Sequence, residues 1–116
     1  MDALAFARAW AAGWNAHDLD RIMAHYADEI VFRSRKAVAL TGMGEVIGKP
    51  ALRRYWAEAL RRQPDLAFEI EEVFEGHRML VILYTNQRGV RTTETLWFDA
   101  GGLVTRAAAC HGVAAP

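Results

Sequence analysis

The chain has 116 residues, of which 53% are hydrophobic, and its 14 basic side chains balance its 14 acidic ones. This length supports one domain with a single core, and the absence of a basic excess argues against general binding to nucleic-acid phosphates. The single cysteine, Cys110, excludes an internal disulfide and a metal site built from several cysteines.

No apolar run approaches the roughly 18–20 residues that cross a bilayer. The first eight residues have a helical pattern and lack the basic region of a signal peptide. We therefore expect a single cytoplasmic domain over residues 1–116, with no contact to membranes.

The first third of the chain predicts helices and one short strand. Apolar residues at helical spacing predict helices over residues 2–16 and 19–27, and Asp18 is suited to cap the second one. Residues 30–33 are β-branched and aromatic, which indicates a strand. Residues 34–47, rich in glycine toward their end, are interpreted as a long loop. Such a loop could close over a pocket or form a surface or dimer contact.

The chain is organised around a third helix, over residues 48–60. Its apolar residues recur at i, i+3, i+4, i+7 and i+8, on one helix face. Pro50 suits the first turn, where its missing N–H costs nothing. Because the apolar face carries the large aromatics Tyr55 and Trp56, it needs a broad surface to pack on, and the strands that follow supply one.

The rest of the chain predicts four strands joined by short turns. They lie between Leu66 and the turn at Glu75, and over residues 79–84, 90–99 and 103–111. The alternation in the first strand slips near Glu71, which predicts a β-bulge. The second strand is apolar on both faces and should be central. Short turns favour a mostly antiparallel meander, and helices followed by strands favour an α+β fold.

Five stretches, in order along almost the whole chain, resemble a known family. They lie at residues 14–20, 26–34, 48–56, at Tyr84, and at residues 94–104. The ordered set is similar to the nuclear-transport-factor-2-like superfamily, specifically its SnoaL-like branch, which includes polyketide cyclases and ketosteroid isomerases. The resemblance implies a cystatin-like fold: three helices packed on a curved, mostly antiparallel mixed sheet, forming a cone with a ligand pocket inside. It also implies dimers that pack through the outer sheet face.

One buried acid stands out on the strand over residues 90–99. Glu94 shares a face with Leu96 and Phe98, which is the more apolar face and the better candidate for the core. Burial there would raise the pKa of its carboxyl, as in a general acid or a neutral hydrogen-bond donor. On the last strand, residues 103, 105, 107, 109 and 111 should share one face, where small Ala109 leaves room beside His111.

The resemblance to ketosteroid isomerases carries over residue by residue. Glu94 matches their pocket carboxylic acid and His111 matches a pocket aromatic, whereas Trp10 and Ser34 stand where those enzymes have a catalytic tyrosine and aspartate. Two of three catalytic positions are therefore changed, so the same chemistry by the same residues is improbable. A Glu94–His111 acid/base pair remains. The alternative is that Glu94 pairs with Arg33 or Arg106 and His111 only caps the sheet.

The candidate site combines these two residues with a lining of aromatic and small side chains. The predicted ligand-binding residues are Trp14, Phe32, Ser34, Tyr55, Trp56, Leu96 and Ala109. No histidine pattern indicates a metal site, and no cofactor is expected.

Two functions remain open. In the first, the domain binds a hydrophobic compound, for example a polycyclic one, and carries out isomerase- or cyclase-like acid/base chemistry. In the second, it is a non-catalytic dimeric binding or assembly module whose cone is filled by its own aromatics. A homodimer through Thr93, Thr95, Trp97, Ala108 and Cys110 is expected in either case.

Overall fold

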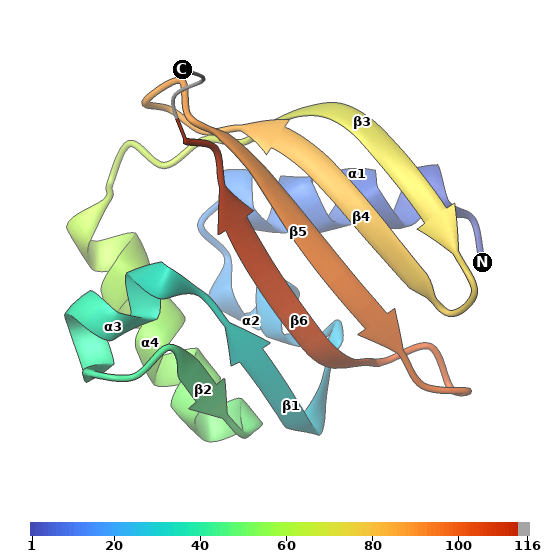
Figure 1. The fold of residues 1–116 in the computed structure, drawn as a ribbon, viewed down its shortest axis with the longest axis horizontal. Helices are drawn as coiled ribbons and strands as arrows, with labels where there is room; N and C mark the ends of the chain where they lie inside the picture. Colours follow the sequence, from blue (N-terminus) through green and yellow to red (C-terminus); the bar gives the residue numbers. More distant parts are fainter. Residues whose placement is uncertain (114–116) are drawn as a thin grey trace.

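A computed structural model describes residues 1–113, which form a curved six-stranded sheet with helices packed on one face (Figure 1). The strand order is β2-β1-β6-β5-β4-β3; β1 and β6 run parallel and the other neighbours antiparallel. The α+β, mostly antiparallel mixed sheet is therefore confirmed. The elements are α1 (Ala3–Asn15), α2 (Leu19–Met23), β1 (Tyr26–Arg33), α3 (Arg35–Thr41), β2 (Glu45–Ile47), α4 (Lys49–Arg62), β3 (Glu69–Gly76), β4 (Met79–Thr85), β5 (Arg91–Phe98) and β6 (Val104–His111).

The helix predicted over residues 19–27 is shorter than expected. Asp18 caps α2 as predicted, since its side chain accepts a hydrogen bond from the Arg21 N–H, but the helix ends at Met23. Strand β1 already begins at Tyr26, four residues before the predicted start. Tyr26 has the spacing of a helix residue, but it is buried from the strand instead, paired with Val104 of β6.

Residues 34–47 are not the predicted loop. Ser34 caps helix α3 by accepting a hydrogen bond from the Lys36 N–H, and Gly42 ends that helix in the left-handed region at φ 78°. Strand β2 then pairs with β1 at the sheet edge. The glycines suggested a loop because each marks an element boundary. The fold therefore has four helices in residues 1–113 instead of the predicted three.

Irregular pairing shapes the sheet at two strand pairs that matter for the site. The bulge predicted near Glu71 is present, between Ile70 and Glu72. A second irregularity lies in β6: Trp97 pairs with Arg106 and Phe98 with Val104, so one residue of β6 is unpaired. The predicted inner face of β6 is consequently wrong at its start, where Val104 is buried instead of Leu103 and Thr105. From position 107 onward the prediction holds.

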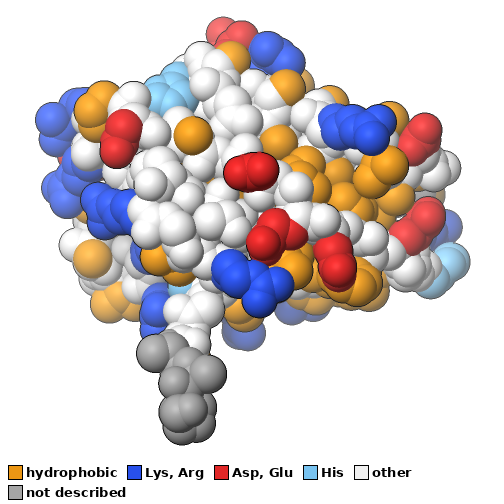
Figure 2. All heavy atoms as spheres, turned by 90° about the horizontal axis from the view of Figure 1, so that it is seen from above, with side chains coloured by type: hydrophobic (Ala, Val, Ile, Leu, Met, Phe, Trp, Pro, Cys, Tyr) orange, Lys and Arg blue, Asp and Glu red, His pale blue; other side chains and the backbone are white. Residues whose placement is uncertain are grey.

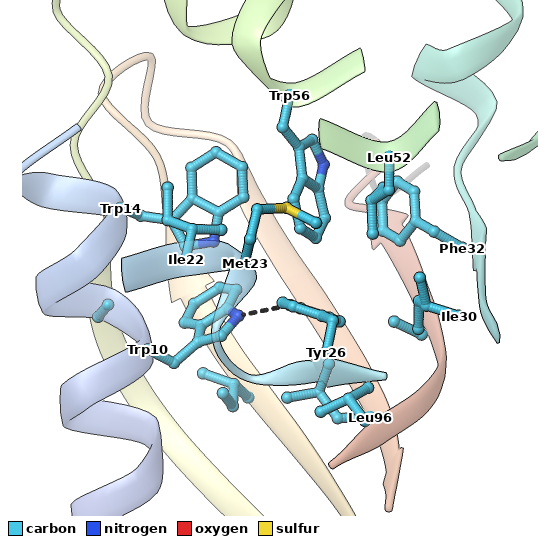
Figure 3. Packing of buried hydrophobic residues seen from close by; sticks show 14 of the residues in the cluster. Trp10, Trp14, Ile22, Met23, Tyr26, Ile30, Phe32, Leu52, Trp56 and Leu96 are labelled. Atoms are coloured by element: carbon cyan, nitrogen blue, oxygen red, sulfur yellow. Dashed lines mark hydrogen bonds between the residues drawn. The ribbon is translucent and has the colours of Figure 1, made fainter. Parts of the chain in front are cut away.

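Aromatic side chains fill much of the space between helices and sheet (Figure 3). Trp56 of α4 makes edge-to-face contacts with Trp14, Tyr26 and Phe32. Below it in Figure 3, the Trp10 indole N–H donates a hydrogen bond of 3.2 Å to the Tyr26 hydroxyl. The central helix thus anchors the core, as its pattern predicted.

A short tether fixes the segment that links α4 to β3. The Asn15 side chain donates to the Phe68 carbonyl and accepts from the Phe68 N–H, at 2.9 and 2.7 Å. His17, whose φ is 54°, places its Nε2 2.8 Å from the Leu66 carbonyl oxygen. His17 therefore has a local structural role, and Leu66 and Phe68 are held against the cavity described next.

Candidate functional site

A cavity of about 80 Å³ lies between the helices and the inner face of the sheet. Residues from every helix but α2, and from β1, β4, β5 and β6, line it. Its buried wall is aromatic, while the partly exposed polar side chains Gln63, Asn86 and Gln87, with the exposed Lys36, form what we call the mouth. A hydrogen bond of 2.9 Å from Gln87 Nε2 to Gln63 Oε1 joins the β4–β5 turn to the end of α4 there.

All but one of the predicted site residues line this cavity. The exception is Leu96, which is fully buried beyond Glu94 on the same face of β5, in the closed part of the core. The cavity opens toward the Thr92 end of that strand, so Leu96 contributes packing only. The residues brought together are Glu94, His111, Trp14, Phe32, Ser34, Tyr55, Trp56 and Ala109.

The carboxyl of Glu94 is the most unusual group in the cavity. The residue is 4% exposed, and burial raises the pKa of the carboxyl to about 8. Within residues 1–113 it has no ion-pair or hydrogen-bond partner. The structural pairing considered for it is therefore wrong, because Arg33 pairs with Glu45 and Arg106 lies over the Trp97 ring.

Three tyrosines lie near enough to the same carboxyl for its charge to affect them. Burial, and secondly the nearby Glu94 charge, raise the pKa of Tyr26, Tyr55 and Tyr84. Their hydroxyls thus stay protonated at neutral pH, and Glu94 is mostly protonated as well. The inner wall of the cavity is neutral at pH 7, with a carboxylic acid that can donate a hydrogen bond.

His111 lies at the end of β6, diagonally across from Glu94. The register pairs Glu94 with Ala109 and Thr92 with His111, and diagonal neighbours on one sheet face are about 7–8 Å apart. Burial, followed by the charges of Lys36 and Arg35, lowers the pKa of His111 to about 4. The imidazole is therefore neutral at pH 7 and faces the cavity beside a neutral acid.

Unpaired polar atoms concentrate at this cavity. Among residues 1–113, the buried side-chain nitrogen and oxygen atoms without a hydrogen-bond partner within 3.5 Å are Trp14 Nε1, Thr92 Oγ1 and His111 Nδ1. All three belong to residues that line the cavity. The Thr92 hydroxyl is nevertheless close enough to the Tyr84 hydroxyl to act against the rise in the pKa of that tyrosine. Buried polar groups in folded proteins are nearly always paired, so this cluster indicates a place where a polar molecule completes the hydrogen bonding.

The sequence reasoning missed the polar mouth. Lys36 lay in a segment interpreted as a loop, and Gln63, Asn86 and Gln87 lie in turns whose spatial neighbours come from distant parts of the chain. Thr92 could have been found, because it shares the inward face of β5 with Glu94.

The sequence matches the model of the SnoaL-like domain over residues 7–110. The chain belongs to the SnoaL-like family. A solved SnoaL-like protein of unknown function from Burkholderia thailandensis is 38% identical, with a TM-score of 0.91 over 96% of this chain and 95% of that one.

More distant solved structures share the fold of this SnoaL-like domain. A cystatin-fold protein from Novosphingobium aromaticivorans is 20% identical, with a TM-score of 0.78 over 95% of this chain and 98% of that one. TerC, crystallised with polyporic acid, is 15% identical, with a TM-score of 0.77 over 95% and 91% of the two chains. No curated protein matches the sequence.

Trp10 and Ser34, which stand where ketosteroid isomerases have a catalytic tyrosine and aspartate, each make a structural hydrogen bond in this SnoaL-like domain. Trp10 lines the cavity, but its indole N–H is bound to Tyr26, and the Ser34 hydroxyl caps α3. Within residues 1–113, no group of three or more His, Cys, Asp or Glu side chains could hold a metal ion. No helix in that range is long and apolar enough to cross a membrane.

Proposed function

We propose that this SnoaL-like domain binds a small, flat carbonyl compound in the cavity and that Glu94 donates a hydrogen bond or a proton to the carbonyl oxygen. The observation that carries the proposal is the buried Glu94 carboxyl, which is mostly protonated at neutral pH and has no partner within residues 1–113. Trp14 Nε1 and His111 Nδ1, also without partners in that range, belong to residues that line the same cavity. A neutral carboxylic acid in an apolar pocket is a group that stabilises a developing oxyanion.

The cavity volume limits the ligand. Drug-sized ligands occupy sites of roughly 300–1,000 Å³, whereas this cavity measures about 80 Å³. A polycyclic compound would require movement of the aromatic lining. We therefore propose a single ring or a short unsaturated chain inside, with its carbonyl oxygen toward Glu94.

The chemistry that fits is proton transfer next to a carbonyl. His111 would accept a proton from the carbon beside the carbonyl while Glu94 gives its proton to the oxygen, which yields an enol. Return of the proton from His111 to another carbon, with Glu94 taking back the proton from the oxygen, would give an isomer. In a ligand with a second carbonyl group, attack of the enol carbon on that carbonyl carbon would close a ring instead. The enol oxygen would then return its proton to Glu94, and the alkoxide formed would take the proton from His111. Because the pKa of His111 is held near 4, it is a weak proton acceptor. Glu94 is therefore better suited to donate its proton than His111 is to accept one. These two residues support ligand binding more strongly than they support catalytic turnover.

We expect 2-cyclohexenone and acetophenone to shift the amide NMR signals of cavity residues, and deuterium from D₂O to enter beside their carbonyls faster with the protein than without it. Glu94→Gln should lower that exchange at least about tenfold, since the acid contributes typically 10²–10⁴-fold in such reactions. Glu75→Gln, an exposed carboxyl in the β3–β4 hairpin, is the matched control. If the compounds bind but deuterium exchange is not accelerated, the domain is a binding module without this catalysis. If neither binding nor exchange is seen, the proposal is overturned.

We also propose a homodimer through the outer sheet face. The register places Thr93 beside Cys110 and Trp97 beside Arg106 on the face opposite the cavity. Trp97 is half-buried under the Arg106 guanidinium, at 5.3 Å from its ring centroid, so it is less exposed than a free surface tryptophan. Sedimentation velocity at micromolar concentration should show a dimer, and a monomer there would rule the proposal out.

A further inference from the structure

The cavity mouth is positively charged. Lys36, at the start of α3, is the one cation among the lining residues, and Glu94 is the only acidic side chain there. Arg35 and the Arg88 side chain of the β4–β5 turn are close enough to lower the pKa of Lys36, after burial as the main cause. In Figure 2, several basic side chains lie on the left, the side on which α3 and α4 lie in Figure 1, and others are spread over the rest of the face.

Within residues 1–113, Arg35, Lys36 and Arg88 have no acidic partners. The ion pairs found within residues 1–113 join Arg33, Arg53, Arg61, Arg62 and Arg91 to acidic side chains, and none includes Arg35, Lys36 or Arg88. Three like charges held together without counter-charges repel one another. An anion at the mouth would relieve that repulsion, and the neutral Glu94 deeper inside would not oppose it.

The remaining polar atoms complete an anion site. Trp14 Nε1 carries a hydrogen that has no acceptor in the described part of the chain, and His111 Nδ1 can donate when it carries the ring proton. Both nitrogens belong to residues that line the cavity. The small volume suits a single ring inside and a charged group outside the aromatic wall.

We propose that the natural ligand is a small aromatic or unsaturated carbonyl compound that also carries a carboxylate, with its carbonyl oxygen toward Glu94, its ring against Trp14 and Trp56, and its carboxylate at the mouth on Lys36 and His111. This inference rests on the proposed function, because it names the substrate class of the same cavity. It adds that the ligand carries a negative charge and that Lys36 selects for it.

Two probes of the same shape, one charged and one neutral, distinguish the contribution of ligand charge to affinity from that of ligand shape. Benzoate and benzamide are titrated into the intact protein at low ionic strength, followed by tryptophan fluorescence and amide NMR shifts. We expect benzoate to bind at least about tenfold more tightly than benzamide, and its affinity to fall as salt rises while that of benzamide stays constant.

The lysine variants assign the effect to one side chain. Lys36→Gln should weaken benzoate binding about tenfold and leave benzamide unchanged, and Arg88→Gln should have a smaller effect of the same sign. Lys49→Gln is the matched control, because Lys49 is the only other lysine and lies at the start of α4 outside this cavity. The Ser34–Lys36 capping bond uses the Lys36 backbone N–H, so the variant keeps it.

The possible failures are distinguishable. If benzamide binds as tightly as benzoate and Lys36→Gln changes neither, the ligand is neutral: this inference is overturned and the proposed function stands. If neither probe shifts cavity signals at millimolar concentration, while 2-cyclohexenone does, the charge inference alone fails. If no probe shifts them, both proposals are overturned.

Discussion

Replacing Glu94 by glutamine is expected to remove a pH-dependent loss of stability of several kcal/mol. In the folded protein, burial raises the pKa of this carboxyl from 4.5 to about 8. Between these two values the unfolded chain releases a proton that the folded chain keeps. The free energy of unfolding therefore falls with rising pH, by up to about 1.4 kcal/mol per pH unit. Below pH 4.5 the two states bind this proton equally, and above pH 8 the loss is complete.

His111 acts in the opposite direction at lower pH. Its pKa in the folded protein is about 4, below the ordinary 6.5, so the unfolded chain binds more protons between these values and stability rises with pH there. The two effects oppose each other from about pH 4.5 to 6.5. From pH 6.5 to 8 the Glu94 contribution acts alone, and the wild-type protein should lose stability in that window.

Urea unfolding of the wild-type protein, Glu94→Gln and Glu75→Gln at pH 5, 6, 7 and 8 measures how the free energy of unfolding depends on pH. Glu94→Gln should approach wild type at pH 5 and exceed it by several kcal/mol at pH 8, while Glu75→Gln follows wild type throughout, because Glu75 is exposed. Wild type and Glu94→Gln curves that stay parallel across the range would show that the carboxyl is solvated or paired in the folded protein.

Replacing Trp56 by alanine is expected to cost about 3–5 kcal/mol of unfolding free energy, the usual cost of truncating a buried aromatic. Its indole is buried and contacts three aromatic rings, those of Trp14, Tyr26 and Phe32. Small domains are stable by only about 5–15 kcal/mol, so the variant should be close to unfolding at 25 °C.

The control for this truncation is another tryptophan. Trp97→Ala removes the same side chain from the outer face, where Trp97 is half-buried beneath Arg106. It should cost about 1 kcal/mol, the scale of a partly exposed aromatic with one cation–π contact. Equal losses for the two variants, measured by urea unfolding at pH 6, would contradict the assignment of Trp56 to the core.

The sequence predicted the elements whose pattern is carried by their own side chains. Helix α4, strands β4 and β5, the bulge at Glu71 and the inward face of Glu94 all follow from residue periodicity. The elements that were predicted wrongly depend on pairing with strands elsewhere in the chain. Strand β1 begins at Tyr26 because β6 pairs with it, and β2 exists because β1 supplies its hydrogen bonds.

The same distinction applies to the candidate site: residues whose own pattern places them were predicted, and features that depend on distant parts of the chain were not. Periodicity placed Glu94 and His111 on one face. The lining aromatics were predicted from their position beside the expected loop or on the helix that faces the sheet, and they converge on one cavity. The charge at the mouth could not be predicted, because Lys36 and Arg88 are 52 positions apart in the sequence and meet only through the fold. The size of the cavity was also beyond prediction, since it depends on how closely the aromatic rings pack.

The ionisation of Glu94 tests the central claim most directly, and carbon NMR of the glutamate carboxyl groups can follow it from pH 3 to pH 10. One carboxyl signal should titrate near pH 8 and be missing from Glu94→Gln, while the exposed glutamates titrate at their usual acidic pH. If every glutamate carboxyl titrates below pH 5, Glu94 is ionised at neutral pH, and the neutral acid on which the proposed chemistry depends does not exist.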